Sequence, residues 1–132
     1  MRVQYSLGKW DSVGINVRPF ACELLEKAKK MFEVVVFTAS HKSYADPVLG
    51  ALDPENKLID YRLYRESCIS ASGIYIKDLG ILENRKMNSV VIVVNLAQSF
   101  LYQLSNGIPI LSWYDDTEDK NSAECLTTRR SD

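Results

Sequence analysis

The chain alternates between continuous apolar runs and segments whose apolar residues recur at helical spacing. Residues 33–38 and 89–95 are almost entirely apolar, as is typical of parallel strands that are covered on both faces. Over 19–31 and 42–52, apolar residues recur at the spacing of an amphipathic helix. Because strands alternate with helices, the pattern predicts an α/β fold with a doubly wound parallel sheet.

Shorter patterns complete the predicted order of elements. Alternating residues near the N-terminus predict a β-hairpin formed by strands at 2–7 and 12–17. Further along, the pattern predicts a short helix at 97–104 and strands at 58–64, 74–77 and 108–111. Residues after Asp115 are mostly polar, so we expect one domain over 1–116 and a polar C-terminal tail over 117–132.

Composition narrows the classes of protein that this chain can represent. Its 132 residues suit one globular domain, with 46% hydrophobic and 25% charged residues. The net charge of −1 predicts no attraction to nucleic acid, and no apolar run approaches the length of a membrane span. The N-terminus has no signal-peptide pattern, and Cys22, Cys68 and Cys125 lack metal-binding spacing, so we expect an intracellular protein with reduced thiols. The single histidine, His41, is expected to be solvated.

Each of the two apolar runs ends in a polar residue. Thr38 ends the first run and Asn95 ends the second, and ligands bind beyond the carboxyl ends of the strands in a doubly wound sheet. A hydroxyl at such a strand end, together with a lysine such as Lys77, fits a phosphate-binding site. The alternatives are a Thr38 hydroxyl that bonds only to local backbone, and a Lys77 that is solvated or paired with Asp78 or Glu66.

A set of ordered motifs carries a family resemblance. They read INVRPF, VVFTASHKSYADP, LDP, RLYRESC, GIYIKDL and YQLSNGIPILSW. In this order, across residues 15–113, they resemble the small C-terminal-domain (CTD) phosphatases, also called NLI-interacting-factor-like phosphatases, of the haloacid dehalogenase superfamily. The last motif is most similar to the CTD-small-phosphatase-like subgroup.

The resemblance implies a fold and a chemistry. The fold is a haloacid-dehalogenase-like (Rossmann-like) parallel sheet flanked by helices, with an N-terminal β-hairpin and a central strand that carries the nucleophile. The chemistry is that of a protein serine/threonine phosphatase with an FCP-type homology domain, an aspartate nucleophile in a DxDx[TV] motif, and Mg²⁺. Thr38 and Lys77 then match phosphate-binding residues, Arg65 matches an arginine near the bound peptide, and Asn95 matches a residue near the metal. The resemblance also implies that the protein is located in the nucleus or the cytoplasm, and it leaves an organelle open as the location.

The sequence departs from this family pattern at two places. It contains no DxDx[TV] motif, so we expect the central nucleophile strand to be missing. The fourth motif places Val94 before Asn95, at the position of a metal-site aspartate. Because Mg²⁺ requires oxygen ligands, we predict no cofactor and interpret Asn95 as a remnant of a metal site. Thr38 and Lys77 are then remnants of an incomplete catalytic set.

Two functions follow from the resemblance and its departures. The first is a degenerate, non-catalytic domain (a pseudophosphatase) that binds a protein partner or forms part of a larger assembly. The alternative is a fragment of a Mg²⁺-dependent phosphoserine protein phosphatase that acts on the RNA polymerase II C-terminal domain or similar phosphoproteins. Without a central strand, the runs at 33–38 and 89–95 would have unpaired edges. They would pair directly or receive a strand from another chain, and we favour the second arrangement.

Overall fold

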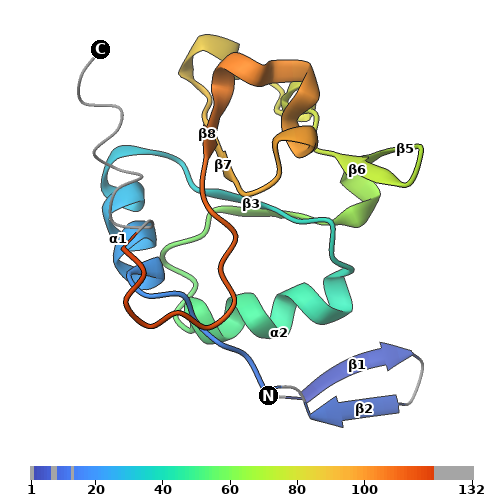
Figure 1. Ribbon diagram of the computed structural model, residues 1–132, viewed down its shortest axis with the longest axis vertical. Helices are drawn as coiled ribbons and strands as arrows, with labels where there is room; N and C mark the ends of the chain where they lie inside the picture. The colour runs from blue at the N-terminus through green and yellow to red at the C-terminus, as the bar shows by residue number, and fades with distance from the viewer. Residues whose placement is uncertain (1, 7–8, 13, 121–132) are drawn as a thin grey trace.

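The computed structural model describes residues 2–6, 9–12 and 14–120 (Figure 1). Its helices are α1 (Ala21–Met31) and α2 (Lys42–Leu52), with 3₁₀ segments η1 (Arg65–Ser67), η2 (Leu79–Ile81), η3 (Met87–Ser89) and η4 (Ala97–Asn106). Its strands are β1 (Arg2–Ser6), β2 (Lys9–Ser12), β3 (Val35–Phe37), β4 (Tyr61–Leu63), β5 (Ile69–Ala71), β6 (Ile74–Ile76), β7 (Ile92–Val94) and β8 (Gly107–Pro109). Most of the polar tail expected over 117–132 lies outside the described residues. Within the described ranges, no helix is long and apolar enough to cross a membrane.

The conformation of the preceding residue marks the start of each α-helix. Phe20, immediately before α1, adopts a left-handed conformation with φ of 63°, so the helix begins at Ala21 rather than at residue 19. Basic residues occupy the last turn of α1, where they stabilise the negative end of the helix dipole. The extended residue His41 precedes α2, which buries Ala45 and Leu49 on one side. Both helices therefore form close to the ranges that their apolar spacing predicts.

Parallel pairing produces two separate two-stranded sheets. In one, β3 pairs with β4 and Val35 lies opposite Tyr61; in the other, β7 pairs with β8 and Ile92 lies opposite Gly107. This arrangement confirms the predicted α/β class, with parallel strands, flanking helices and an N-terminal hairpin. In the view of Figure 1, β3 lies between α2 and the β7–β8 pair. Among the described residues, β3 and β7 do not hydrogen-bond to each other, so the two apolar runs are not joined directly.

The N-terminal hairpin differs from the expected one in the bounds of its second strand. β1 pairs antiparallel with β2, and Arg2 lies opposite Ser12. The strand predicted at 12–17 was wrong, because β2 ends at Ser12 and residues 14–18 have no regular structure. Gly14 lies two residues after Ser12, and glycine weakens strand formation. The tip of the hairpin, residues 7–8, lies outside the described residues.

A second hairpin, β5–β6, was not predicted. Its turn residues Ser72 and Gly73 both have positive φ angles, 50° and 75°, which is the requirement of a two-residue type I′ turn. The predicted extended segment at 74–77 corresponds to β6, whereas β5 has no buried face and therefore no alternating apolar pattern. This hairpin carries Lys77 immediately after β6.

The main apolar cluster lies beneath β7. It consists of Leu79, Ile92, Val94 and Phe100, and Val94 is only 6% exposed. Gly107 allows this packing, because a Cβ atom at that position would lie 2.1 Å from the Phe100 ring. The β7–β8 pair and η4 therefore form one packed unit around the phenylalanine.

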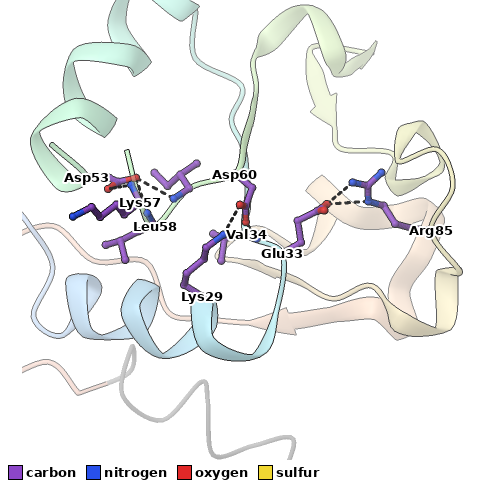
Figure 2. A network of polar contacts seen from close by, with 9 residues as sticks. Lys29, Glu33, Val34, Asp53, Lys57, Leu58, Asp60 and Arg85 are labelled. Carbon is purple, nitrogen blue, oxygen red and sulfur yellow. Dashed lines mark hydrogen bonds and ion pairs between the residues drawn. The ribbon is translucent and has the colours of Figure 1, made fainter. Parts of the chain in front are cut away.

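Carboxylates anchor the connections around the β3–β4 pair (Figure 2). Asp60 accepts a hydrogen bond from Val34 N at 2.8 Å and forms an ion pair with Lys29, which joins the end of α1 to the start of β3. Asp53 is 2% exposed and accepts three backbone hydrogen bonds, at 2.9, 3.0 and 3.0 Å, from Lys57, Leu58 and Ile59. These bonds hold the loop that leads from α2 into β4.

We predict that Asp53→Asn lowers the thermal unfolding midpoint by several degrees at neutral pH. Burial opposes ionisation of Asp53, but the N–H groups of Ile59, Lys57 and Leu58 outweigh it and lower the pKa of the carboxyl. A lowered folded pKa gives stabilisation that is present above the unfolded pKa of about 3.9 and is lost as the pH falls through the folded value. Thermal melts followed by circular dichroism should therefore show a difference from the parent chain that shrinks below about pH 4.

Glu55→Gln is the matched control for this variant. The Glu55 carboxylate lies 67% exposed on the same loop and pairs with the exposed Lys57 ammonium. Exposed ion pairs contribute little to stability. Equal midpoints for the two variants at neutral pH would contradict the anchoring role of Asp53.

Candidate functional site

Thr38 lies directly after β3, at the carboxyl end of the strand. Its backbone N–H donates to Leu63 O at 2.9 Å, which continues the pairing with β4. Its hydroxyl oxygen accepts a hydrogen bond from Ser40 N at 3.0 Å. The local backbone bond considered for Thr38 is therefore present. A hydroxyl that accepts one bond still has its proton to donate.

Arg65 connects the segment after β3 to the β5–β6 hairpin. Its Nε donates to Ala39 O at 2.6 Å, and its Nη1 lies 2.9 Å from Nε2 of His41. Its guanidinium also lies over the Tyr75 ring, 4.9 Å from the centroid. His41 is exposed as expected, but its ring contacts Arg65, which the sequence did not indicate. Arg65 thus has a fixed position beside the backbone that follows Thr38.

Lys77 is held between the β5–β6 hairpin and η4. Its backbone N–H donates to Ser99 O at 2.7 Å. Burial lowers the pKa of its ammonium, and the charge of nearby Cys68 opposes this effect. Neither carboxylate considered as its partner forms an ion pair with it within the part of the chain that the structure describes: Asp78 instead accepts from Gly80 N at 2.8 Å and from Gln103 Nε2 at 2.7 Å. Lys77 is therefore a desolvated positive charge without a bound carboxylate.

Cys68 belongs to this group, although the sequence did not single it out. Its thiol contacts Thr38 O at 3.8 Å. Burial raises the pKa of the thiol, and the charges of Lys77 and Arg65 act in the opposite direction. Both cations therefore lie within electrostatic reach of the same sulfur atom. A signal was available, because residues i and i+3 in a 3₁₀ turn lie on the same side, as Arg65 and Cys68 do.

A second polar cluster forms around Asp46, a residue of α2. Asp46 accepts hydrogen bonds from Lys42 Nζ at 2.7 Å, from Arg62 Nη1 at 3.0 Å and from the Tyr64 hydroxyl. Burial opposes ionisation of Asp46, but the bonds from Lys42, Tyr64 and Arg62 outweigh it and lower the pKa of the carboxyl to about 2. The cluster fixes the end of β4 against α2. Arg65 follows Tyr64 directly in the sequence, so the cluster also helps to position Arg65.

The segment after β7 offers a poor site for a divalent cation. Asn95 is exposed, and its Nδ2 donates to Ser112 Oγ at 3.0 Å. The preceding Val94 side chain is buried in the apolar cluster. Across residues 2–6, 9–12 and 14–120, no group of three or more His, Cys, Asp and Glu side chains could hold a metal ion. Mg²⁺ binds through carboxylate and other oxygen ligands, so the residues present around Asn95 do not fit it.

The chain matches a known family along almost its whole length. The sequence pattern of the NLI interacting factor-like phosphatases matches residues 1–129. CTD small phosphatase-like protein 2 of Dictyostelium discoideum is 52% identical over 78% of this chain and 18% of its own length. A probable C-terminal domain small phosphatase of the same organism is 47% identical, and the human CTD small phosphatase-like protein is 42% identical. The shared segments cover 90% and 85% of this chain but 38% and 40% of those proteins, so the chain spans less than half of these relatives.

A solved structure has the same fold. A variant of the fission yeast RNA polymerase II CTD phosphatase Fcp1, bound to beryllium fluoride, superposes with a TM-score of 0.63 over 86% of this chain and 35% of its own. The two sequences are 22% identical over this match. The likeness confirms the haloacid-dehalogenase-like architecture of the described chain.

We predict that Lys77→Met slows the alkylation of Cys68. The substitution removes a positive charge that lowers the thiol pKa but keeps the length of the side chain. The thiol pKa should then rise, so the thiolate fraction near pH 8 and the alkylation rate should both fall. Iodoacetamide labelling followed by peptide mass spectrometry gives the rate, with the exposed Cys22 as an internal reference.

A second lysine variant controls for the general loss of charge. Lys57→Met removes an exposed lysine that is paired with Glu55 and whose charge is not among those that shift the thiol pKa. It should leave the Cys68 rate unchanged. Equal Cys68 rates for both variants would show that Lys77 does not act on the thiol.

Proposed function

This chain belongs to the NLI interacting factor-like phosphatase family, and we propose that within it the chain acts as a non-catalytic domain that binds a protein partner. The observation that carries the proposal is the burial of Val94. By the family resemblance, this position holds an aspartate beside the metal. Here an isopropyl group packs among Leu79, Ile92 and Phe100 instead.

The apolar surroundings of Val94 argue against metal-dependent chemistry by this chain alone. A carboxylate at this point would be an unpaired charge among hydrocarbon side chains, which is strongly unfavourable. The neighbouring Asn95 would offer a single neutral oxygen. Lewis-acid catalysis of phosphoryl transfer needs a cation held by charged oxygen ligands, and the described residues around β7 supply none.

The residues near Thr38 support anion binding without catalysis. Lys77 carries a positive charge in a partly desolvated position, and the charges of Lys77 and Arg65 both act on Cys68. Thr38 retains a hydroxyl proton to donate. A phosphate or carboxylate group on a partner protein would neutralise these cations and accept their hydrogen bonds. We therefore propose that the partner presents an acidic or phosphorylated group to Thr38, Arg65 and Lys77.

The alternative is a Mg²⁺-dependent phosphoserine protein phosphatase of which this chain is one part. The names of the relatives favour it, and the chain spans only 18% to 40% of their lengths. In this case another segment would supply the attacking carboxylate and the metal ligands. By the same resemblance, either form would act in the nucleus or cytoplasm.

We predict no phosphatase turnover by the purified chain. By this proposal the chain lacks the attacking group and the metal ligands. These groups normally supply most of an enzyme's rate enhancement, which is at least about 10⁶-fold. The assay is hydrolysis of para-nitrophenyl phosphate and of a phosphoserine peptide with millimolar Mg²⁺. Release of phosphate that scales with protein concentration and disappears in Lys77→Ala would overturn the non-catalytic proposal.

We also predict weak binding of inorganic phosphate at millimolar concentration and low ionic strength. The amide resonances of Ser40 and Lys77 should shift in a saturable manner, because both residues border the cationic group. Lys77→Met should weaken this binding about tenfold or more, as loss of a desolvated charge contact costs on the order of 1.5–3 kcal/mol. Lys57→Met is the control and should leave the titration unchanged. Absence of any shift at saturating phosphate would contradict anion binding.

A further inference from the structure

A chemically labile pair of residues lies at the junction of η4 and β8. Asn106 ends η4 and Gly107 begins β8, and this is the only place in the sequence where glycine follows asparagine. Asparagine is most prone to spontaneous deamidation before glycine, because no side chain shields the nitrogen of the following residue. The fold around this pair therefore decides whether the reaction can occur.

Deamidation is a reaction of the backbone with the side-chain amide. The glycine nitrogen loses its proton and attacks Cγ of the asparagine, so that a new C–N bond forms. The bond between Cγ and Nδ2 breaks and ammonia leaves, which gives a cyclic succinimide. Solvent water then opens the ring at either carbonyl, and the product is aspartate or isoaspartate. The reaction thus needs a free amide group, an accessible glycine nitrogen and water.

The packing of the chain requires the amide group of Asn106. The residue is only 8% exposed, and its Nδ2 donates to Met87 O at 2.7 Å and to Val90 O at 2.8 Å. An amide nitrogen has two protons and can satisfy both carbonyl oxygens, whereas an ionised carboxylate can only accept. An aspartate at this position would place an acceptor and a buried charge against two acceptors, which is unfavourable.

The packing requires the glycine for a different reason. A Cβ atom on Gly107 would lie 2.1 Å from the ring of Phe100, which is 5% exposed in the apolar cluster. Neither member of the pair can therefore be replaced without disturbing the contacts beneath β7. The same contacts that stabilise this unit keep a reactive dipeptide in the chain.

The folded state blocks each requirement of the reaction. Both protons of the Asn106 amide are engaged, and the Gly107 N–H donates to Leu104 O. Burial of Asn106 limits the access of water. Gly107 is also held opposite Ile92 by the pairing of β8 with β7. Ring closure therefore requires these hydrogen bonds to open first.

We propose that Asn106 is a site of spontaneous deamidation that the folded β7–β8 unit protects, so that opening of this unit becomes irreversible. Isoaspartate would add a methylene group to the main chain directly before β8 and disturb its register with β7. Aspartate would disrupt the contacts with the two carbonyl oxygens. The change would extend to Lys77, because Lys77 N donates to Ser99 O of η4 at 2.7 Å.

The test compares the purified chain in mildly alkaline buffer with and without denaturing guanidinium chloride. Proteolysis and peptide mass spectrometry measure the conversion of Asn106 to the acid, and chromatography separates the aspartate and isoaspartate forms. Asn88, which is exposed and followed by Ser89, is the internal reference in each sample. The ratio of the Asn106 rate to the Asn88 rate should rise about tenfold or more on denaturation. An equal ratio under both conditions, or no conversion of Asn106 in denaturant, would overturn the proposal.

Two variants test whether opening of the β7–β8 unit controls the reaction in the folded chain. Phe100→Leu removes part of the ring that packs against Gly107 and should accelerate deamidation of Asn106 severalfold in buffer. Leu49→Val is the matched control, because it removes a methylene group from a buried residue of α2 and should leave the rate close to that of the parent. Equal acceleration by both variants would overturn control by this unit. If Phe100→Leu does not fold, the comparison of the parent with and without denaturant decides alone.

A third variant tests the irreversibility. Asn106→Asp imitates one product of the reaction and should lower the thermal unfolding midpoint by several degrees, because a buried hydrogen-bond donor is replaced by a charge. Asn88→Asp makes the same chemical change at an exposed position and should have little effect. Equal midpoints for the two variants would overturn the claim that deamidation prevents the unit from closing again.

Discussion

Hydrogen bonding of the strand backbone is the constraint on which the rest of this structure depends. Each residue of a buried strand carries one donor and one acceptor, and each unpaired buried group costs on the order of 1–3 kcal/mol. A domain has only about 5–15 kcal/mol of net stability, so a long unpaired edge cannot remain buried. β3 and β7 meet this constraint on one edge each, through β4 and β8. The other edge of each strand pairs with no further strand among the described residues. The structure is therefore divided into two parallel pairs, with a small apolar core beneath β7.

The polar clusters compensate for this limited core. Asp46, Asp53 and Asp60 each accept several hydrogen bonds, and together they connect α1, α2, β3 and β4. The lowered pKa of Asp46, about 2, means that its contacts persist across the neutral and mildly acidic range. These contacts also determine where the segments after β3 and β4 lie. The same clusters therefore stabilise the fold and position Thr38 and Arg65.

The packing of Val94 supports the proposal of a non-catalytic domain. By the family resemblance this position holds a metal-site carboxylate, whereas here an apolar side chain at the carboxyl end of β7 packs in the cluster around Phe100. The cationic residues Arg65 and Lys77 are unaffected by this change, because the β5–β6 hairpin and the segment after β3 hold them. The proposed recognition site and the packing around Val94 therefore rely on different elements.

The sequence by itself determined the order and type of the main elements, because apolar periodicity is a local property of the chain. The runs at 33–38 and 89–95 became β3 and β7, and the ordered motifs identified the family that the comparisons confirmed. Local pattern failed at β5, where exposed residues leave no periodic signal, and it misplaced the second strand of the N-terminal hairpin. Only the tertiary structure decided that the Cys68 thiol contacts Thr38 O, and that, among the described residues, β3 pairs only with β4 and β7 only with β8. Both features depend on contacts between residues far apart in the sequence, and no spacing along the chain encodes them.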